Sequence, residues 1–142
     1  MKKTTISRRV AAIFGRISIS ISTAASRHSK KDYVDSATAV KIDRWIKEKS
    51  WMEDLSQEEV ARKLNLRSEQ LGQYFYIRTG KSFLKWRRGM RIEEAKKLLL
   101  EDRKMPTVLV GEAVGIPDKS SFRRQFKEIT GYTPAEWRRL EH

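Results

Sequence analysis

A short pattern of residues occurs twice in this chain and restricts its fold more than any other feature of the sequence. The first copy consists of Val60-Ala61, Leu64-Asn65-Leu66, Leu71, Phe75 and Thr79-Gly80. The second consists of Val110-Gly111, Val114-Gly115-Ile116, Phe122, Phe126 and Thr130-Gly131. The copies are offset by 50 residues before a central turn and by 51 residues after it. Such internal similarity predicts two structurally equivalent units.

Each copy has the residues that two helices joined by a tight turn require. A small residue, Ala61 or Gly111, allows the second helix to cross close to the first. Asn65 or Gly115 tolerates a positive φ at the turn. Apolar residues four positions apart then hold the second helix down, and its other face is left to solvent or to DNA. We therefore predict two helix-turn-helix units, although a generic helical bundle also explains a single copy.

Every segment after Ser36 is predicted to be helical, so the expected fold is all-α with about seven helices. The expected parts are a basic leader over 1–36, a first helix-turn-helix subdomain over 37–82, a linker helix over 83–101 and a second subdomain over 102–142.

Several residues predict where helices begin and end. The first helix is expected to bury Val40, Ile42, Trp45 and Ile46 and to end near Ser50. Later helices are expected to begin at capping residues and to end at glycine. These signals are Ser56 with Glu59, Ser82, Thr133 with Glu136, and Gly80.

The charge of the chain indicates a polyanionic partner. The chain has 31 Lys and Arg against 18 Asp and Glu, a formal net charge of +13, and nucleic acid is the commonest partner of such proteins. Eight of the positive charges and no acidic residue precede Asp32. We predict that this leader is a mobile tail, with a strand over 16–23 or a targeting peptide as alternatives. Binding of the leader to an anionic membrane surface is a further alternative.

The composition argues against an enzyme. The chain has no cysteine, which excludes disulfides, thiolate metal sites and cysteine nucleophiles, and its two histidines are His28 and His142. The adjacent carboxylates of Glu58-Glu59 and Glu93-Glu94 point apart on a helix. We therefore expect no catalytic site, no metal and no cofactor. No apolar run approaches the roughly 18–20 residues that span a bilayer, and a cytoplasmic location is expected.

The chain resembles the AraC/XylS family of bacterial transcription regulators over about residues 38–139. The resemblance rests on residues 55–61 (LSQEEVA), Phe75, 79–83 (TGKSF), 91–99 (RIEEAKKLL), 122–127 (FRRQFK) and 130–138 (TGYTPAEWR). It implies that recognition helices at about 68–78 and 119–128 enter successive major grooves, roughly 34 Å apart. The linker helix would fix that spacing or oblige the DNA to bend.

The resemblance implies a sequence-specific regulator of transcription that binds double-stranded DNA as a monomer in the bacterial cytoplasm, associated with the nucleoid. An activator that also contacts RNA polymerase fits the family. Gly111 and Ile116 stand where the family usually has alanine and phenylalanine, so the second subdomain is expected to be less stable or to bind DNA less tightly. Two alternatives stay open: a C-terminal piece of a longer regulator, and a truncated regulator that binds a related protein.

The expected DNA-binding residues lie on three helices. They are Arg67, Ser68, Glu69, Gln73 and Tyr76 on the first recognition helix, Lys119, Ser120, Ser121, Arg123 and Arg124 on the second, and Arg87 and Arg91 on the linker helix.

These residues are expected to have different tasks. Gln73 suits adenine and Glu69 suits cytosine, although Glu69 also has a local explanation as an acid that stabilises a helix N-terminus. Arg123 or Arg124 is the best candidate to read guanine, with phosphate contact as the competing task. Lys119 is expected to contact phosphate. Arg87 and Arg91 are either solvated or bound to phosphates.

Overall fold

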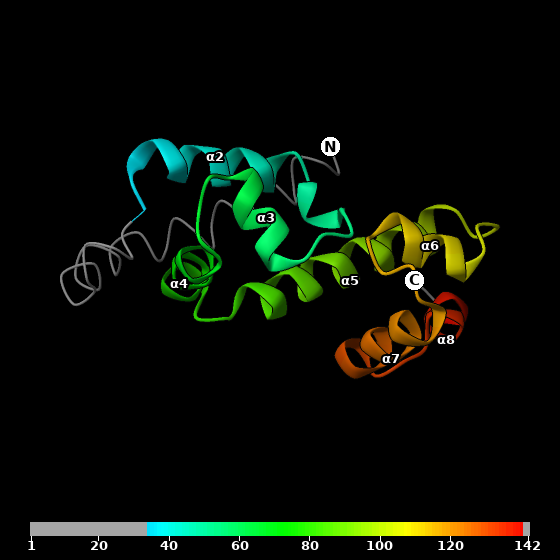
Figure 1. Cartoon of the computed structure of the whole chain (residues 1–142). Helices are drawn as coiled ribbons and strands as arrows, with labels where there is room; N and C mark the ends of the chain where they lie inside the picture. The colour runs from blue at the N-terminus through cyan, green and yellow to red at the C-terminus, as the bar shows by residue number, and fades with distance from the viewer. Residues whose placement is uncertain (1–33, 141–142) are drawn as a thin grey trace. The chain divides into compact units, whose positions relative to one another are not determined.

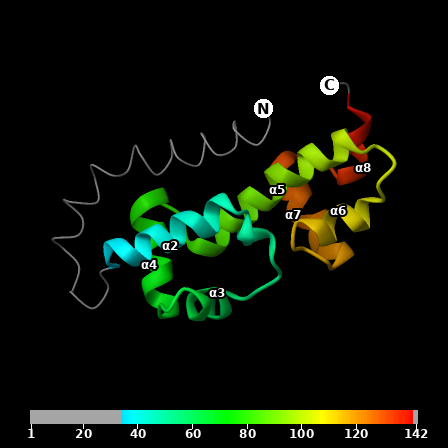
Figure 2. The same ribbon diagram turned by 90° about the horizontal axis from the view of Figure 1, so that it is seen from above.

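A computed structural model describes residues 34–140 of the chain, so the predictions for the leader before residue 34 lie outside the described residues. This part consists of helices and contains no strand (Figures 1 and 2). The elements are α2 (Ser36–Lys47), the 3-10 helix η2 (Ser50–Met52), α3 (Gln57–Lys63), α4 (Ser68–Thr79), α5 (Phe83–Glu101), α6 (Thr107–Ala113), α7 (Lys119–Thr130) and α8 (Pro134–Arg139). Within residues 34–140, the seven α-helices confirm the all-α prediction. None of these helices has both the length and the apolar character needed to cross a lipid bilayer.

Tertiary contacts divide the described residues into two compact units. The first unit contains residues 34–50 and Leu55–Trp86, and the second contains Trp51–Asp54 and residues 87–140. Helix α5 therefore contributes its first turn to the first unit and its remainder to the second. The sequence placed residues 51–54 in the first subdomain and the whole of 83–101 in a separate linker, so the units differ from the expected boundaries.

An aromatic cluster forms the centre of the first unit. The ring centroids of Phe75 and Trp86 lie 4.6 Å apart, and those of Phe75 and Phe83 lie 5.0 Å apart. Trp45 lies against the same group, with its ring centroid 5.8 Å from that of Phe83. Aromatic pairs at such distances add about 0.5–1.5 kcal/mol beyond the burial of their surface. The rest of this core consists of Ile42, Ile46, Val60, Ala61, Leu64, Leu71 and Tyr74.

Helix α2 differs from the prediction at two points. Val40 is 59% exposed rather than buried, because it lies on the helix face opposite to Ile42 and Trp45. The helix also ends at Lys47 rather than near Ser50, since Lys49 adopts a left-handed conformation with φ of 58°. The chain then turns into η2, where Trp51 is 1% exposed.

The predicted helix starts are confirmed. The Ser56 N–H donates to the Glu59 carboxylate at 2.7 Å, and the Glu59 N–H donates to the Ser56 hydroxyl at 3.1 Å. Thr133 and Glu136 form the same reciprocal pair at 3.0 and 3.2 Å. The Lys85 N–H donates to the Ser82 hydroxyl at 3.2 Å. Each cap satisfies amide groups that have no partner inside the helix.

The core of the second unit is smaller and mostly aliphatic. It consists of Ile92, Ala95, Leu99, Val110, Val114, Ile116, Phe122 and Phe126. Trp137 packs at its edge, where its ring centroid is 6.0 Å from that of Phe126 and 5.0 Å from the ammonium group of Lys96.

Two arginines join separate parts of the second unit through backbone carbonyls. The Arg138 guanidinium donates to the carbonyls of Leu99 at 3.0 Å, Asp102 at 3.1 Å and Met105 at 2.6 Å. It thereby satisfies carbonyls at and beyond the C-terminal end of α5. The Arg91 guanidinium donates to the carbonyls of Trp51 at 2.8 Å and Glu53 at 2.6 Å. The second bond pair explains why Trp51–Asp54 belongs to this unit.

Candidate nucleic-acid interface

The two copies of the repeat share a residue of positive φ and one backbone hydrogen bond at the start of their turns. Asn65 and Gly115 adopt φ values of 55° and 88°, as the sequence predicted. The Leu66 N–H donates to the Ala61 carbonyl at 2.8 Å, and the Ile116 N–H donates to the Gly111 carbonyl, also at 2.8 Å. The two turns therefore begin in the same way, although five residues connect α6 to α7 and four connect α3 to α4.

The copies are also equivalent where α4 and α7 end. The Thr79 hydroxyl donates to the Phe75 carbonyl at 2.6 Å and accepts from the Lys81 N–H at 3.1 Å. The Thr130 hydroxyl donates to the Phe126 carbonyl at 2.8 Å and accepts from the Tyr132 N–H at 3.1 Å. Gly80 and Gly131 follow in the left-handed conformation that commonly ends a helix. The prediction of two like units is therefore confirmed down to single hydrogen bonds.

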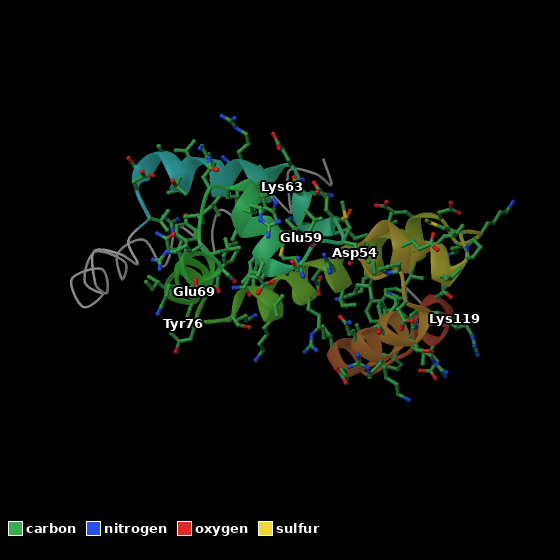
Figure 3. All side chains as sticks on the ribbon, viewed as in Figure 1. Asp54, Glu59, Lys63, Glu69, Tyr76 and Lys119 are labelled. Carbon is green, nitrogen blue, oxygen red and sulfur yellow. The ribbon has the colours of Figure 1, made fainter. Side chains whose placement is uncertain are left out.

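Helix α4 presents a mixed polar surface. Glu69 and Arg67 are exposed, Tyr76 is 62% exposed, and Ser68 and Gln73 are half-buried. Figure 3 shows Glu69 and Tyr76 as side chains of this helix. The prediction from the sequence did not include Gln57 of α3, which donates to the Ser68 carbonyl at 3.0 Å and lies beside Gly72. This contact ties α3 to the first turn of α4.

Helix α7 presents a basic surface. Lys119, Ser120, Arg123 and Arg124 are exposed, and Ser121 is half-buried. The sequence missed the cap of this helix, where the Asp118 carboxylate accepts from the Ser121 N–H at 2.7 Å. That hydrogen bond lowers the pKa of Asp118 below its ordinary value. An Asp directly before a helix was the available signal.

Arg87 and Arg91 are not the solvated residues that one of the two expectations for the linker helix described. Each side chain is 8% exposed, so neither is a solvated surface cation, and Arg91 uses its guanidinium on the carbonyls of Trp51 and Glu53. Burial, and then the neighbouring charge of Arg87, lowers the pKa of Arg91 to about 10, which still leaves it charged at neutral pH. Arg91 therefore has a structural task in the second unit and Arg87 is buried, and the contact of either residue with DNA phosphate stays a prediction.

The repeat extends beyond Gly80 and Gly131, and this extension accounts for the burial of Arg87. The offset of 51 that follows the turn also pairs Ser82 with Thr133 and Trp86 with Trp137. It pairs Arg87 with Arg138, whose guanidinium is committed to backbone carbonyls. This extended match was the signal in the sequence that Arg87, like Arg138, has a structural task.

Comparison with known proteins places the repeat in a known family of domains. A family model described as a helix-turn-helix domain matches residues 60–140, which include both copies. The arabinose operon regulatory proteins of Salmonella typhimurium and Escherichia coli are each 42% identical to this chain over 79 residues. The alignments cover 56% of this chain but 28% and 27% of those proteins. The chain therefore spans less than a third of the length of these relatives.

A solved structure has the same fold. The C-terminal domain of AraT, a response regulator from Geobacillus stearothermophilus, matches this chain with a TM-score of 0.67 and 29% sequence identity. The match covers 75% of this chain and 87% of that domain.

Proposed function

This chain belongs to the AraC/XylS family of helix-turn-helix regulators, and we propose that it is a sequence-specific regulator of transcription that reads two successive major grooves of double-stranded DNA. The observation on which this proposal rests is the recurrence of one turn hydrogen bond and one residue of positive φ before α4 and α7, two helices with polar outer faces. A helix held by its apolar face with its outer face free is the element that enters a major groove in helix-turn-helix proteins.

The exposed and half-buried residues of α4 and α7 supply the chemistry that base recognition needs. On α4, Gln73 can bond to adenine and Glu69 can accept from the cytosine amino group. On α7, Arg123 or Arg124 can bond to guanine through two parallel hydrogen bonds. The remaining surface residues, Arg67, Ser68, Tyr76, Lys119, Ser120 and Ser121, suit contacts to phosphate and sugar.

The two recognition helices are proposed to act from one molecule. Successive major grooves on one face of B-DNA are roughly 34 Å apart, and the 19-residue α5 separates the two copies along the chain. A single chain with two readers has no need of a partner to recognise a bipartite site. We therefore expect one protein per DNA site, which sedimentation of the complex measures directly.

Selection from a randomised duplex library tests the proposal. We expect a winning site with two short conserved blocks about one helical turn apart. Gln73→Ala should relax the base preference in one block and leave the other unchanged, whereas Arg124→Ala should do the reverse. Binding that depends steeply on salt but prefers no sequence would reduce the protein to a non-specific basic binder and contradict the proposal.

A further inference from the structure

The second unit contains a pocket of about 330 Å³ at the N-terminal end of α7. Its polar lining comes from three helices and consists of Thr107, Lys119, Arg123, Thr133, Glu136 and Arg139. Figure 3 shows Lys119, which belongs to the first turn of α7. The pocket thus gathers side chains that lie up to 32 residues apart in the sequence around the start of a proposed recognition helix.

The lining of this pocket is positively charged. It contains three cations, Lys119, Arg123 and Arg139, against a single carboxylate, that of Glu136. The Glu136 carboxylate already accepts from the Thr133 N–H at 3.0 Å. Within residues 34–140, the side chains of Lys119 and Arg123 form no hydrogen bond or ion pair. The pocket therefore has cationic donors available for an anionic ligand.

A phosphate group matches this set of donors. Arginine binds phosphate oxygens through a planar fork of N–H groups, and lysine adds a point charge. DNA supplies phosphates along both edges of the groove that α7 is proposed to enter, whereas free inorganic phosphate is the other source of the same chemistry. We favour the DNA backbone, because the pocket lies beside the first turn of the recognition helix.

The pocket also separates two neighbouring arginines. Arg123 lines the pocket, but Arg124 does not. The guanidinium of Arg124 lies 3.7 Å from the Glu128 carboxylate, one helical turn along the exposed surface. Adjacent residues of a helix point about 100° apart, so one side chain can approach the DNA backbone while the other faces the base edges.

We propose that Lys119, Arg123 and Arg139 clamp one DNA phosphate and so position α7, and that Arg124 is the arginine that reads bases. This assignment rests on the proposed DNA binding and divides the tasks of α7 between its residues. It also adds Arg139 of α8, which the sequence did not single out, to the interface.

Salt-dependent binding of single variants tests the assignment. Wild type, Arg123→Ala, Arg124→Ala and Arg139→Ala are compared on the selected site and on duplexes with single base changes. Lys104→Ala is the charge-matched control, because Lys104 is exposed and does not line the pocket. Circular dichroism melting of each variant verifies that it is folded.

We expect Arg123→Ala and Arg139→Ala to lower affinity by the same factor on every duplex. Each should also reduce the slope of log affinity against log salt, by up to about 1, because the three cations share one phosphate. Arg124→Ala should change the preferred base at one position, and Lys104→Ala should change neither property. A changed base preference in Arg123→Ala with an unchanged salt slope would overturn the clamp.

Titration with inorganic phosphate separates the two sources of the ligand. Arginine side-chain NMR signals of Arg123 and Arg139 are followed in the free protein. If phosphate shifts these signals and DNA displaces it, the clamp is supported. If phosphate binds there but Arg123→Ala leaves the salt slope on DNA unchanged, the pocket serves a free anion and the assignment fails. If the wild-type protein prefers no DNA sequence, the proposed function is contradicted. The phosphate clamp is still tested in that case, because the salt dependence of each variant can be measured on DNA of any sequence.

Discussion

The two helix-turn-helix copies share one turn hydrogen bond but are stabilised differently. In the first copy, α4 packs on an aromatic cluster that includes Phe75, Phe83 and Trp86. In the second copy, α7 packs on a mostly aliphatic core, and arginines bonded to carbonyls hold the surrounding segments. The helix that follows α4, α5, has 19 residues, whereas the helix that follows α7, α8, has six.

This contrast shows that the turn of each unit depends on residues adjacent in the sequence, whereas the core that supports its second helix depends on residues far apart in the sequence. The bond from residue 66 to Ala61 and the bond from residue 116 to Gly111 have equal lengths, although the cores behind them differ. Apolar packing is non-directional and tolerates changes of partner. The guanidinium–carbonyl bonds of the second unit depend on fixed geometry, so we expect the second copy to be the more sensitive of the two to substitution.

The largest difference should appear at the two turn residues. Gly115→Ala places a methyl group in a left-handed conformation, which costs about 1–2 kcal/mol, and against the Met52 carbonyl oxygen, which adds about 1–3 kcal/mol. Asn65→Ala in the first copy should cost only about 1 kcal/mol. Hydrogen exchange of α4 and α7 amides in each variant measures the two losses. Equal losses of stability in the two variants would contradict the expectation that the second copy is the more sensitive to substitution.

Loss of an arginine contact should come next. Arg138→Ala leaves the carbonyls of Leu99, Asp102 and Met105 without this donor. A hydrogen bond to a charged group is worth about 1.5–3 kcal/mol, and we expect a loss of that size in urea unfolding. Arg103→Ala, an exposed neighbour that makes one bond at 3.2 Å, is the control. If both variants lose the same amount, charge rather than geometry explains the effect.

A smaller effect is expected at the crossing of each helix pair. A Cβ at Gly111 would lie 2.8 Å from the Ile116 carbonyl oxygen and 2.9 Å from the Phe122 ring. Gly111→Ala gains about 0.5–1 kcal/mol of helix propensity but overpacks this contact at a cost of about 1–3 kcal/mol, so it should destabilise the second unit. Ala61→Gly should destabilise the first unit by about 0.5–1 kcal/mol. A stabilised Gly111→Ala would indicate that the two crossings are interchangeable.

The smallest effect concerns pH. Hydrogen bonds with Ser56 and Ser121 lower the pKa values of Glu59 and Asp118 below their ordinary values. A lowered folded-state pKa contributes stability above the unfolded-state pKa, which is lost as the pH falls through the folded value. Melting temperatures should therefore fall below about pH 4. Asp118→Asn retains a capping group and should remove its share of the pH dependence; an unchanged pH profile would exclude this cap as a contributor.

The sequence predicted those features that depend on neighbours along the chain. Capping at Ser56 and Thr133 and the positive φ at Asn65 and Gly115 follow from a few adjacent residues. The burial of Arg91 involves Trp51 and Glu53, about 40 residues earlier in the chain, and helical periodicity contains no information on such a contact. The same limit applies to the pocket lined by Arg123 and Arg139, which forms only where separate helices meet.

The membership of Trp51–Asp54 in the second unit has a consequence for how such regulators can be recombined. A fragment that begins at Arg87 lacks residues 51–54, which include the carbonyl groups of Trp51 and Glu53 that Arg91 binds and that of Met52 beside Gly115. A chimera that transplants α6, α7 and α8 with most of α5 onto another regulator therefore needs residues 51–54 as well, although they precede the first reader in the chain. Helices α4 and α7 belong to different structural units, but a single crossover in the gene does not separate these units.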